Sequence, residues 1–543
     1  MNKIKALLVA INAKYIHKVL APWCIKAFCD AHAPRCEVAV YESNINEPIG
    51  DIVESIYKLS PDIIGISTYI WNVDYTKKIA DTIKKILPSC IIVLGGPEVS
   101  FELSLDDYPT VDYLIQGAGE AAFLKLTNSI AAGLAPPKCI IKDEGLIFND
   151  FPSPFTAEYF CSSQTDTGAS INNQLVYYES SRGCPFHCAY CLSSVTHGVQ
   201  ELPLERVKEE LSLLLSHGAA CIKFVDRTFN ANKGRMAAIL EYIYSLDTAC
   251  TFHFEVAGDL FDKRLLDIIA AMPINRVQFE VGIQSVNPPT LAAVSRKTNI
   301  KAALENISRI TTMNNCHVHV DLIAGLPYET LETSAAAVNR CLAARPHMLQ
   351  LGFLKLLKGS QLRKHSEKLD YIYTDYAPYE VLKSNAMSMD KLLQLKDIER
   401  VIDKFYNSGM FANSLQYAAV KLFDTEYDLF RVLGEYCKGV GNIKVSLKNA
   451  YSILLEFLKH YGDKDEAEHY IKLDCLTFDT KGMLPDGIES LRDRAVEAQL
   501  KNTLEYKGKN IRVEYFAYDN KKRLFIYKDK HPISKIYPVK ELE

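Results

Sequence analysis

The sequence lacks several features that would place it in a specialised class. No apolar run approaches the roughly 18 residues of a transmembrane helix, and the first apolar run is too short for the core of a signal peptide. Lysine and arginine (62) do not exceed aspartate and glutamate (66), so the net charge of −4 indicates no basic surface for nucleic acid. We therefore expect neither a membrane span nor a nucleic-acid partner.

Length and cysteine content narrow the class further. A chain of 543 residues is too long for one hydrophobic core and favours roughly two to four domains. Its 48% apolar and 24% charged residues match ordinary globular proteins and argue against a disordered or fibrous chain. Fifteen cysteines without a secretory signal indicate reduced thiols, and hence a cytoplasmic location.

Residues 1–135 alternate short apolar runs with amphipathic helical patterns, which predicts a parallel, doubly wound, flavodoxin-like α/β domain. The loops at the carboxyl ends of such strands form the ligand crevice. The expected helices are Asp74–Leu87 and Glu120–Ala132, and the expected strands are Ile4–Ala10, Cys36–Tyr41, Asp62–Ser67, Ile91–Leu94 and Tyr113–Gln116.

The rest of the chain divides into three parts. Prolines at 136, 137, 152 and 154 and a polar stretch at 162–173 predict a linker over 136–174. Residues 175–380 contain six strand-and-helix units, which favour a barrel or partial (β/α)6 barrel whose chemistry lies at the carboxyl ends of its strands. Residues 381–543 are expected to be mostly helical, with a terminal hairpin across Tyr518–Lys522.

Three cysteines, Cys184, Cys188 and Cys191, fall on an irregular loop directly after the first strand of this barrel. Three thiolates can ligate three irons of a cubane cluster and leave the fourth iron open, whereas an electron-transfer cluster needs a fourth cysteine. A zinc site remains the alternative, but it usually needs four ligands, and only His187 or His197 lies nearby.

The order Cys-x3-Cys-x2-Cys, followed by six β/α units, resembles the radical S-adenosylmethionine (SAM) family. The resemblance implies a [4Fe-4S] cluster on the three cysteines, SAM bound at the open iron, and cleavage of SAM to a 5′-deoxyadenosyl radical. It also implies a reductant such as flavodoxin or ferredoxin.

The same resemblance implies that five residues at strand ends bind SAM: Asp226, Glu255, Gln284, Arg296 and Asp321. An acid suits the ribose hydroxyls, and an arginine suits the SAM carboxylate. The alternative for each residue alone is a helix cap, which strand-end acids and amides often provide.

Three small-residue loops in residues 1–135 can admit a ligand close to the backbone. Gly117-Ala-Gly-Glu-Ala-Ala122 matches a dinucleotide fingerprint, but it follows the last strand of the domain, whereas such a fingerprint follows the first. The domain instead resembles the cobalamin (B12) domain that precedes many radical SAM cores, which implies cobalamin contacts from Ser67, Thr68, Trp71, Gly95, Gly96, Gly117 and Gly119.

One departure from other cobalamin domains concerns the lower face of cobalt. The stretch from Ala10 to His17 lacks the Asp-x-His-x-x-Gly motif that supplies a histidine ligand in domains of the methionine-synthase type. The remaining candidates for that face are His17, Tyr69, Trp71 and Asn72, and for Trp71 packing at a domain interface is an equal alternative.

The combined resemblance is to cobalamin-dependent radical SAM enzymes, with a C-terminal domain similar to one of unknown function. It implies methylation of an unactivated carbon in an unknown small-molecule or peptide substrate. Ring formation or rearrangement with the same cofactors stays open, and so does a non-catalytic iron–sulfur electron-transfer or sensor protein. Methylthiolation of tRNA is disfavoured because it needs a further cysteine set and a basic module.

Overall fold

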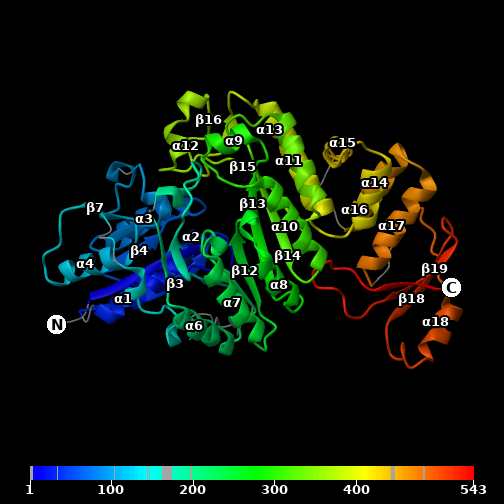
Figure 1. The fold of residues 1–543 in the computed structure, drawn as a ribbon. Helices are drawn as coiled ribbons and strands as arrows, with labels where there is room; N and C mark the ends of the chain where they lie inside the picture. Colours follow the sequence, from blue (N-terminus) through cyan, green and yellow to red (C-terminus); the bar gives the residue numbers. More distant parts are fainter. Residues whose placement is uncertain are drawn as a thin grey trace. The chain divides into compact units, whose positions relative to one another are not determined.

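The computed structural model describes residues 4–542 except 33–34, 103, 143–144, 146, 162–170, 172–173, 196–197, 442–446 and 481–483. His197 and most of the polar stretch at 162–173 therefore lie outside the described residues. The chain forms two compact units, and Figure 1 follows it from the blue N-terminus to the red C-terminus. The first unit comprises Met1–Val256, Ala292–Lys297 and Leu354–Leu382, and the second comprises Ala257–Leu291, Thr298–Phe353 and Lys383–Glu543.

The first unit opens with a six-stranded parallel sheet in the order β3-β1-β4-β5-β6-β7. This order is the flavodoxin-like one with an added edge strand, and its switch point lies between β1 and β4. The strands are β1 (Ile4–Asn12), β3 (Cys36–Asn44), β4 (Ile63–Ser67), β5 (Ile91–Gly95), β6 (Tyr113–Gln116) and β7 (Cys139–Lys142). The predicted doubly wound fold is confirmed.

Helices cover both faces of this sheet because successive residues of its central strands are apolar and point alternately to the two faces. Leu7 and Val9 of β1 pack toward α2 (Ile49–Leu59) and α3 (Val73–Ile86). Ala6 and Leu8 pack toward α1 (Ala21–His32) and α4 (Glu120–Ala131). Each fully buried leucine, valine or isoleucine contributes about 1.5–3 kcal/mol.

The stretch predicted as a linker contains regular structure. Within it, β7 pairs with β6 in parallel, so the sheet extends past residue 135. The same stretch contains a short helix, α5 (Ala157–Cys161). Two strands that follow it, β9 (Ser181–Gly183) and β10 (Val199–Glu201), form an antiparallel pair.

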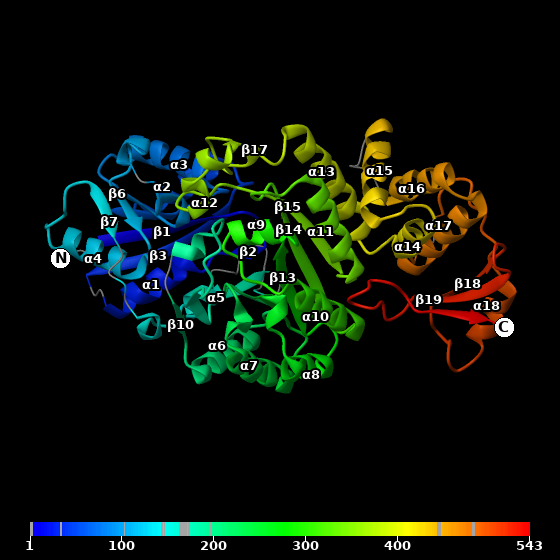
Figure 2. The ribbon, with the colours of Figure 1, turned by 45° about the horizontal axis from the view of Figure 1, so that its top comes forward.

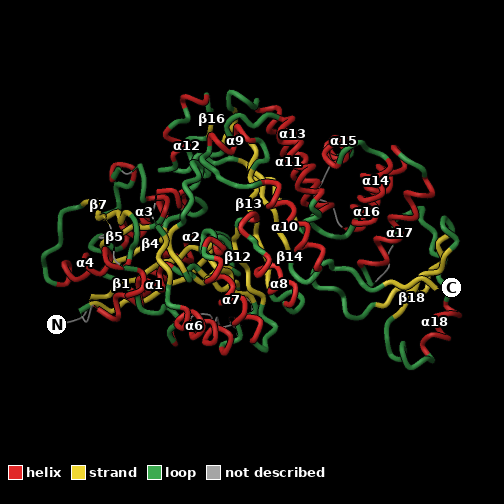
Figure 3. Tube along the Cα trace, viewed as in Figure 1, coloured by secondary structure: helices red, strands yellow, loops and turns green. Residues whose placement is uncertain are grey.

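The six predicted barrel strands are present in chain order, alternating with helices (Figure 3). In the first unit the order is β12-β11-β8-β2, and in the second it is β15-β14-β13. The strands are β8 (Leu175–Tyr178), β11 (Cys221–Phe224), β12 (Thr251–Val256), β13 (Val277–Gln284), β14 (His317–Ala324) and β15 (Met348–Phe353). The main helices are α6 (Leu204–Ser216), α7 (Lys233–Ser245), α8 (Lys263–Ala271), α9 (Pro288–Ala293), α10 (Ile300–Met313) and α11 (Leu331–Ala343).

One strand of this second sheet comes from the N-terminal domain. The loop after β1 contains β2 (His17–Lys18), which pairs in parallel with β8. Farther along the first unit, a segment with α12 (Gln361–Lys364), β16 (Ile372–Tyr373) and the start of β17 (Val381–Lys383) follows β15.

The C-terminal part is mostly helical and ends in a small sheet, as predicted (Figure 2). Its helices are α13 (Met389–Val401), α14 (Ala412–Lys421), α15 (Glu426–Gly439), α16 (Leu447–Tyr461), α17 (Lys464–Phe478) and α18 (Arg494–Lys501). The predicted hairpin is formed by β18 (Ile511–Phe516) and β19 (Lys521–Ile526), and β20 (Val539–Leu542) adds a third strand that the sequence did not reveal.

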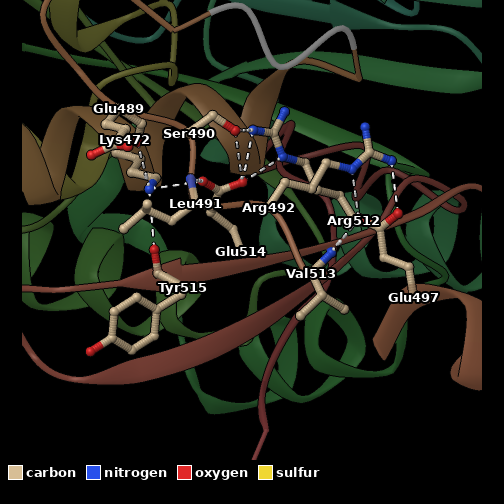
Figure 4. A network of polar contacts seen from close by, with 10 residues as sticks. All are labelled: Lys472, Glu489, Ser490, Leu491, Arg492, Glu497, Arg512, Val513, Glu514 and Tyr515. Carbon is tan, nitrogen blue, oxygen red and sulfur yellow. Dashed lines mark hydrogen bonds and ion pairs between the residues drawn. The ribbon is translucent and has the colours of Figure 1, made fainter. Parts of the chain in front are cut away.

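A buried ionic network fastens this sheet to the helices before it (Figure 4). Glu514 of β18 is fully buried and lies 2.8 Å from both Lys472 Nζ and Arg512 Nη2. It also accepts a hydrogen bond from the backbone N–H of Leu491.

Among the described residues, no helix has the length and apolarity that crossing a membrane requires.

Candidate cofactor-binding site

The cysteine triplet lies on a compact loop that follows β9. Cys184 and Cys188 are buried and Cys191 is half-buried, and all three are reduced thiols. The N–H of Cys191 donates to the carbonyl of Cys188 at 3.0 Å, so the last two thiols belong to one tight turn. Three close thiols that form no disulfide suit the three-cysteine iron site that the spacing predicts.

Backbone hydrogen bonds hold this loop on two sides through Ala189. Its N–H donates to the carbonyl of Val294 at 2.9 Å, and its carbonyl accepts from the N–H of Leu362 at 2.8 Å. Because these bonds involve the main chain, the loop position depends on segments more than 100 residues away in sequence.

Arg296, predicted to bind SAM, lies beside the cysteine loop. Its Nη1 is 3.7 Å from Cys188 Sγ and 3.2 Å from the hydroxyl of Tyr190. Burial raises the pKa of Tyr190, so the phenol stays neutral at physiological pH. A guanidinium held here can pair with a carboxylate bound next to the cluster loop.

Asp226, the second predicted SAM residue, is directed toward the chain that precedes the cysteines. Its carboxylate accepts from Ser180 N–H at 3.0 Å, Ser180 Oγ at 2.7 Å and Ser181 Oγ at 2.5 Å. Burial raises its pKa to about 6 although these three donors favour the charged form. Asp226 also lines a cavity of about 230 Å³ together with Thr228 and Arg235. Its main observable role is to fix the turn before Cys184.

The other three predicted SAM residues lie on β12, β13 and β14. Glu255, in the first unit, is half-buried and lies 3.8 Å from Lys223 Nζ. In the second unit, the buried Oε1 of Gln284 has no hydrogen-bond partner among the described residues, and the backbone of Gln284 has φ = +68°. Asp321 is brought close to that residue, since Gly282 of β13 is its register partner.

Sequence reasoning missed two residues beside Asp321. Glu280 and His319 are direct partners across β13 and β14, and their ligand atoms lie within 4.8 Å of those of Asp321. On both strands alternate residues are buried, so the intervening ones share the other face. The period of two was visible in the sequence and could have identified this set.

Most of the predicted cobalamin residues meet at the carboxyl ends of β4, β5 and β6. The N–H of the buried Thr68 donates to the carbonyl of Gly95 at 2.7 Å. At Gly96, where φ is +104°, a Cβ would lie 2.6 Å from the Thr68 carbonyl oxygen, whereas at Gly95 the nearest atom would be 3.9 Å away. The next loop begins at Gly117, whose N–H donates to Ser100 Oγ at 3.3 Å. Gly96 is therefore required by the chain itself, whereas a Cβ at Gly95 would make only an ordinary van der Waals contact.

Gly119 and Trp71 have structural explanations of their own. A Cβ on Gly119 would lie 2.9 Å from Ile25 Cδ1, so this glycine lets α4 approach α1. Trp71 is 40% exposed and stacks on Tyr69 with ring centroids 4.3 Å apart. This stacked pair, with Trp71 exposed and Tyr69 largely buried, follows β4, which borders the switch point.

Three of the four candidates for the lower face of cobalt are engaged by the protein. His17 lies on β2, and its Nδ1 is 2.8 Å from the Tyr177 hydroxyl. Asn72 donates to the carbonyls of Ile11 and Ser67, both at 3.0 Å, and thereby joins the ends of β1 and β4. Trp71 Nε1 donates to the same Ile11 carbonyl at 3.4 Å. Tyr69 remains as a candidate, and burial raises its pKa to about 12.

Three family models match successive parts of the chain. Residues 6–127 match a B12 binding domain and residues 178–341 match the radical SAM superfamily. Residues 367–531 match a protein family of unknown function (DUF4080).

Several curated proteins are similar in sequence. An uncharacterized methyltransferase of Pyrococcus horikoshii is 28% identical over 53% of this chain. The cobalamin-dependent radical SAM methyltransferase TokK of Streptomyces tokunonensis is 25% identical over 56% of this chain. A 2-(S-pantetheinyl)-carbapenam-3-carboxylate methyltransferase of Streptantibioticus cattleyicolor is 23% identical over 68%. The matches span 66%, 49% and 60% of these relatives, respectively.

Solved structures share the fold. The cobalamin-dependent SAM radical enzyme OxsB, with aqua-cobalamin and SAM bound, aligns with a TM-score of 0.60 at 14% identity, over 87% of this chain and 79% of OxsB. The radical SAM methyltransferase TsrM of Kitasatospora setae, with cobalamin and a [4Fe-4S] cluster bound, aligns with a TM-score of 0.54 at 17% identity, over 69% of this chain and 76% of TsrM. The chain thus belongs to the radical SAM proteins that carry a B12-binding domain before the radical SAM domain and a C-terminal domain of unknown function.

Proposed function

We propose that this protein is a cobalamin-dependent radical SAM enzyme that methylates an unactivated carbon of a small-molecule or peptide substrate. The observation that carries the proposal is the cysteine loop, with three adjacent reduced thiols and a guanidinium 3.7 Å from one of them. It lies in one compact unit with a flavodoxin-like sheet whose loops after β5 and β6 are rich in glycine.

The residues present fit the groups that the family implies. Cys184, Cys188 and Cys191 would hold the cluster, and the loops after β4, β5 and β6 would hold cobalamin. When bound, the cluster supplies the electron that cleaves SAM to a 5′-deoxyadenosyl radical, and cobalamin supplies a methyl carrier. Arg296, in the same unit as the three cysteines, offers a charge-assisted partner for the SAM carboxylate.

Burial of two cysteines and the neutral state of Tyr190 both suit the cluster loop to its proposed ligands. Cys184 and Cys188 are only 8% exposed each, so solvent has little access to these two thiols. The neutral phenol of Tyr190 next to Arg296 leaves the guanidinium charge available for an anionic ligand. The electron must come from outside the chain, and we expect flavodoxin or ferredoxin to deliver it.

A second candidate reaction is ring formation on the substrate radical. It is favoured by the similarity to an anaerobic magnesium-protoporphyrin IX monomethyl ester cyclase of Rubrivivax gelatinosus. That relative is 22% identical and is matched over 68% of this chain and 69% of its own length. An electron-transfer or sensor role is a weaker alternative because the loop offers three cysteines and leaves one iron position for a ligand.

The test is anaerobic reconstitution with iron and sulfide, followed by incubation with SAM and dithionite. The full chain should form 5′-deoxyadenosine, and a variant with alanine at all three cysteines should form none. A triple variant that still binds about four irons per chain would contradict the cluster assignment.

A further inference from the structure

Two buried carboxylates stand next to the glycines of the expected cobalamin crevice. Glu98 follows Gly95, Gly96 and Pro97 in the loop after β5, and Glu120 is the first residue of α4 after the loop that follows β6. Glu98 is 6% exposed and Glu120 is 4% exposed. A buried carboxylate is costly unless it has a cationic or hydrogen-bonding partner. Both residues find such partners outside the six-stranded sheet, within the same unit.

Glu120 is bonded to the strand that leads into the cysteine loop. Its Oε1 lies 3.0 Å from Nη2 of Arg182, which is two residues before Cys184. The same guanidinium is chelated by Glu179 at 3.0 and 2.8 Å and lies 4.6 Å from the Phe148 ring centroid. Arg182 is therefore a fixed cation between the two elements.

The backbone around Arg182 cannot shift freely. The next residue, Gly183, has φ = +101°, and a Cβ there would lie 2.2 Å from the carbonyl oxygen of Gly198 on the facing segment. Arg182 itself pairs with Gln200, whose side chain accepts from the N–H of Phe148 at 2.6 Å. The guanidinium is thus held by its strand as well as by its ion pairs.

Glu98 and its neighbour Glu102 are bonded to the segment that holds the other side of the cysteine loop. Glu98 Oε1 lies 3.3 Å from Lys358 Nζ and accepts a hydrogen bond from the Tyr379 hydroxyl. Glu102 pairs with Arg363 at 2.9 Å. Leu362 lies between Lys358 and Arg363 in the sequence. Its N–H donates to the carbonyl of Ala189, a residue of the cysteine loop between Cys188 and Cys191.

We propose that Glu98 and Glu120 are positioning residues, which fix the cobalamin loops against the two ends of the cysteine loop. Glu120 acts through Arg182 at the Cys184 end, and Glu98 acts through Lys358 and its neighbours at the Ala189 side. The inference rests on the proposed function, because it concerns the placement of cobalamin relative to the cluster. Transfer chemistry depends on such placement, since a misplacement of about 1 Å can cost about 100-fold in rate.

The test uses Glu98→Gln, Glu120→Gln and their double variant in the full reconstituted chain. Glutamine keeps the shape and removes the charge. Glu54→Gln is the matched control because Glu54 lies in the same domain and pairs with Lys58 at 2.6 Å on its exposed surface. Two quantities are measured: the affinity for added hydroxocobalamin and the magnetic interaction between Co(II) and the reduced cluster in electron paramagnetic resonance.

Each buried-site variant should keep its iron and bind hydroxocobalamin about tenfold more weakly, as couplings between contacting groups predict. The magnetic interaction should change, and Glu54→Gln should match the wild type in both measurements. If Glu120→Gln does not fold, Arg182→Lys replaces it, because lysine keeps the charge but cannot bond Glu120 and Glu179 in the same forked geometry. If Glu98→Gln does not fold, Lys358→Met replaces it, because this change removes the cation that Glu98 contacts.

Wild-type affinity together with an unchanged magnetic interaction in these variants would overturn the inference and leave the proposed function standing. A wild-type chain that takes up iron and no cobalamin would overturn the proposed function, and the inference with it.

Discussion

Removal of the Asp226 side chain should loosen the turn that presents Cys184. Asp226→Ala deletes the acceptor of three hydrogen bonds and leaves the N–H of Ser180, a fully buried residue, without its partner. Bonds to a charged group are worth about 1.5–3 kcal/mol, and an orphaned buried donor costs about 1–3 kcal/mol. We expect a local loss of about 2–4 kcal/mol, because part of both costs is recovered by solvent and rearrangement.

Hydrogen–deuterium exchange is the suitable assay because it reports local opening in a chain of several domains. Peptides that span residues 175–190 should exchange roughly 30- to 1000-fold faster in Asp226→Ala, which corresponds to the loss given above. Asp226→Asn should lose far less protection, since its amide oxygen still accepts from Ser180 N–H. Wild-type exchange in the alanine variant would refute the assigned role of Asp226.

The pH dependence of the same peptides gives an independent check. Burial raises the pKa of Asp226 from 3.8 to about 6, so folding favours the protonated form. The native state therefore binds more protons than the unfolded state between about pH 4 and 6, and local stability falls as pH rises through this window. The full effect corresponds to about 3 kcal/mol and should be absent from Asp226→Asn.

Three further predictions concern other parts of the chain. Gly95→Val should abolish cobalamin uptake in a folded protein because the protein tolerates a Cβ there but the expected crevice would be filled, whereas Gly96→Val should destabilise the domain even without ligand, as thermal unfolding will show. Glu514→Ala should lower stability by about 3–5 kcal/mol because it strands two buried cations, while Glu541→Gln in the exposed pair with Lys521 should leave the melting temperature unchanged. Arg296→Ala should weaken SAM binding by about 1.5–3 kcal/mol in calorimetry, and unchanged affinity would return this residue to a structural role.

Most of the strands could be predicted because both faces of each sheet are covered, which gives continuous or alternating apolar runs. The predicted and observed limits of Tyr113–Gln116 coincide, and the predicted strand Ile91–Leu94 ends one residue before the observed β5. The missed strands are short or lie at edges: β2 has two residues, and β7 and β20 contain no fully buried residue. An edge strand needs no apolar alternation, so its sequence resembles that of a loop.

The candidate site could be predicted only where its residues are close in sequence. The cysteine spacing is local, and it indicated the loop and its chemistry directly. Long-range contacts leave no such signal, and the bonds from Val294 and Leu362 to Ala189 required the structure. The sequence explained Gly96 by the approach of a ligand. In the structure the carbonyl of Thr68 already leaves no room for a side chain at this position. The domain limits at 135, 174 and 380 and the individual SAM and cobalamin contacts remain predictions.

The central claim is tested most directly by the products that the reconstituted full chain forms from SAM in the presence of cobalamin and a reductant. The account predicts both 5′-deoxyadenosine and S-adenosylhomocysteine, since one SAM is cleaved to the radical and a second gives up its methyl group. Neither product should form in a control that lacks both cofactors, in which the three cluster cysteines are alanine and cobalamin is omitted. Formation of 5′-deoxyadenosine alone would contradict methyl transfer and favour ring formation or rearrangement, and formation of neither product would contradict the radical SAM assignment itself.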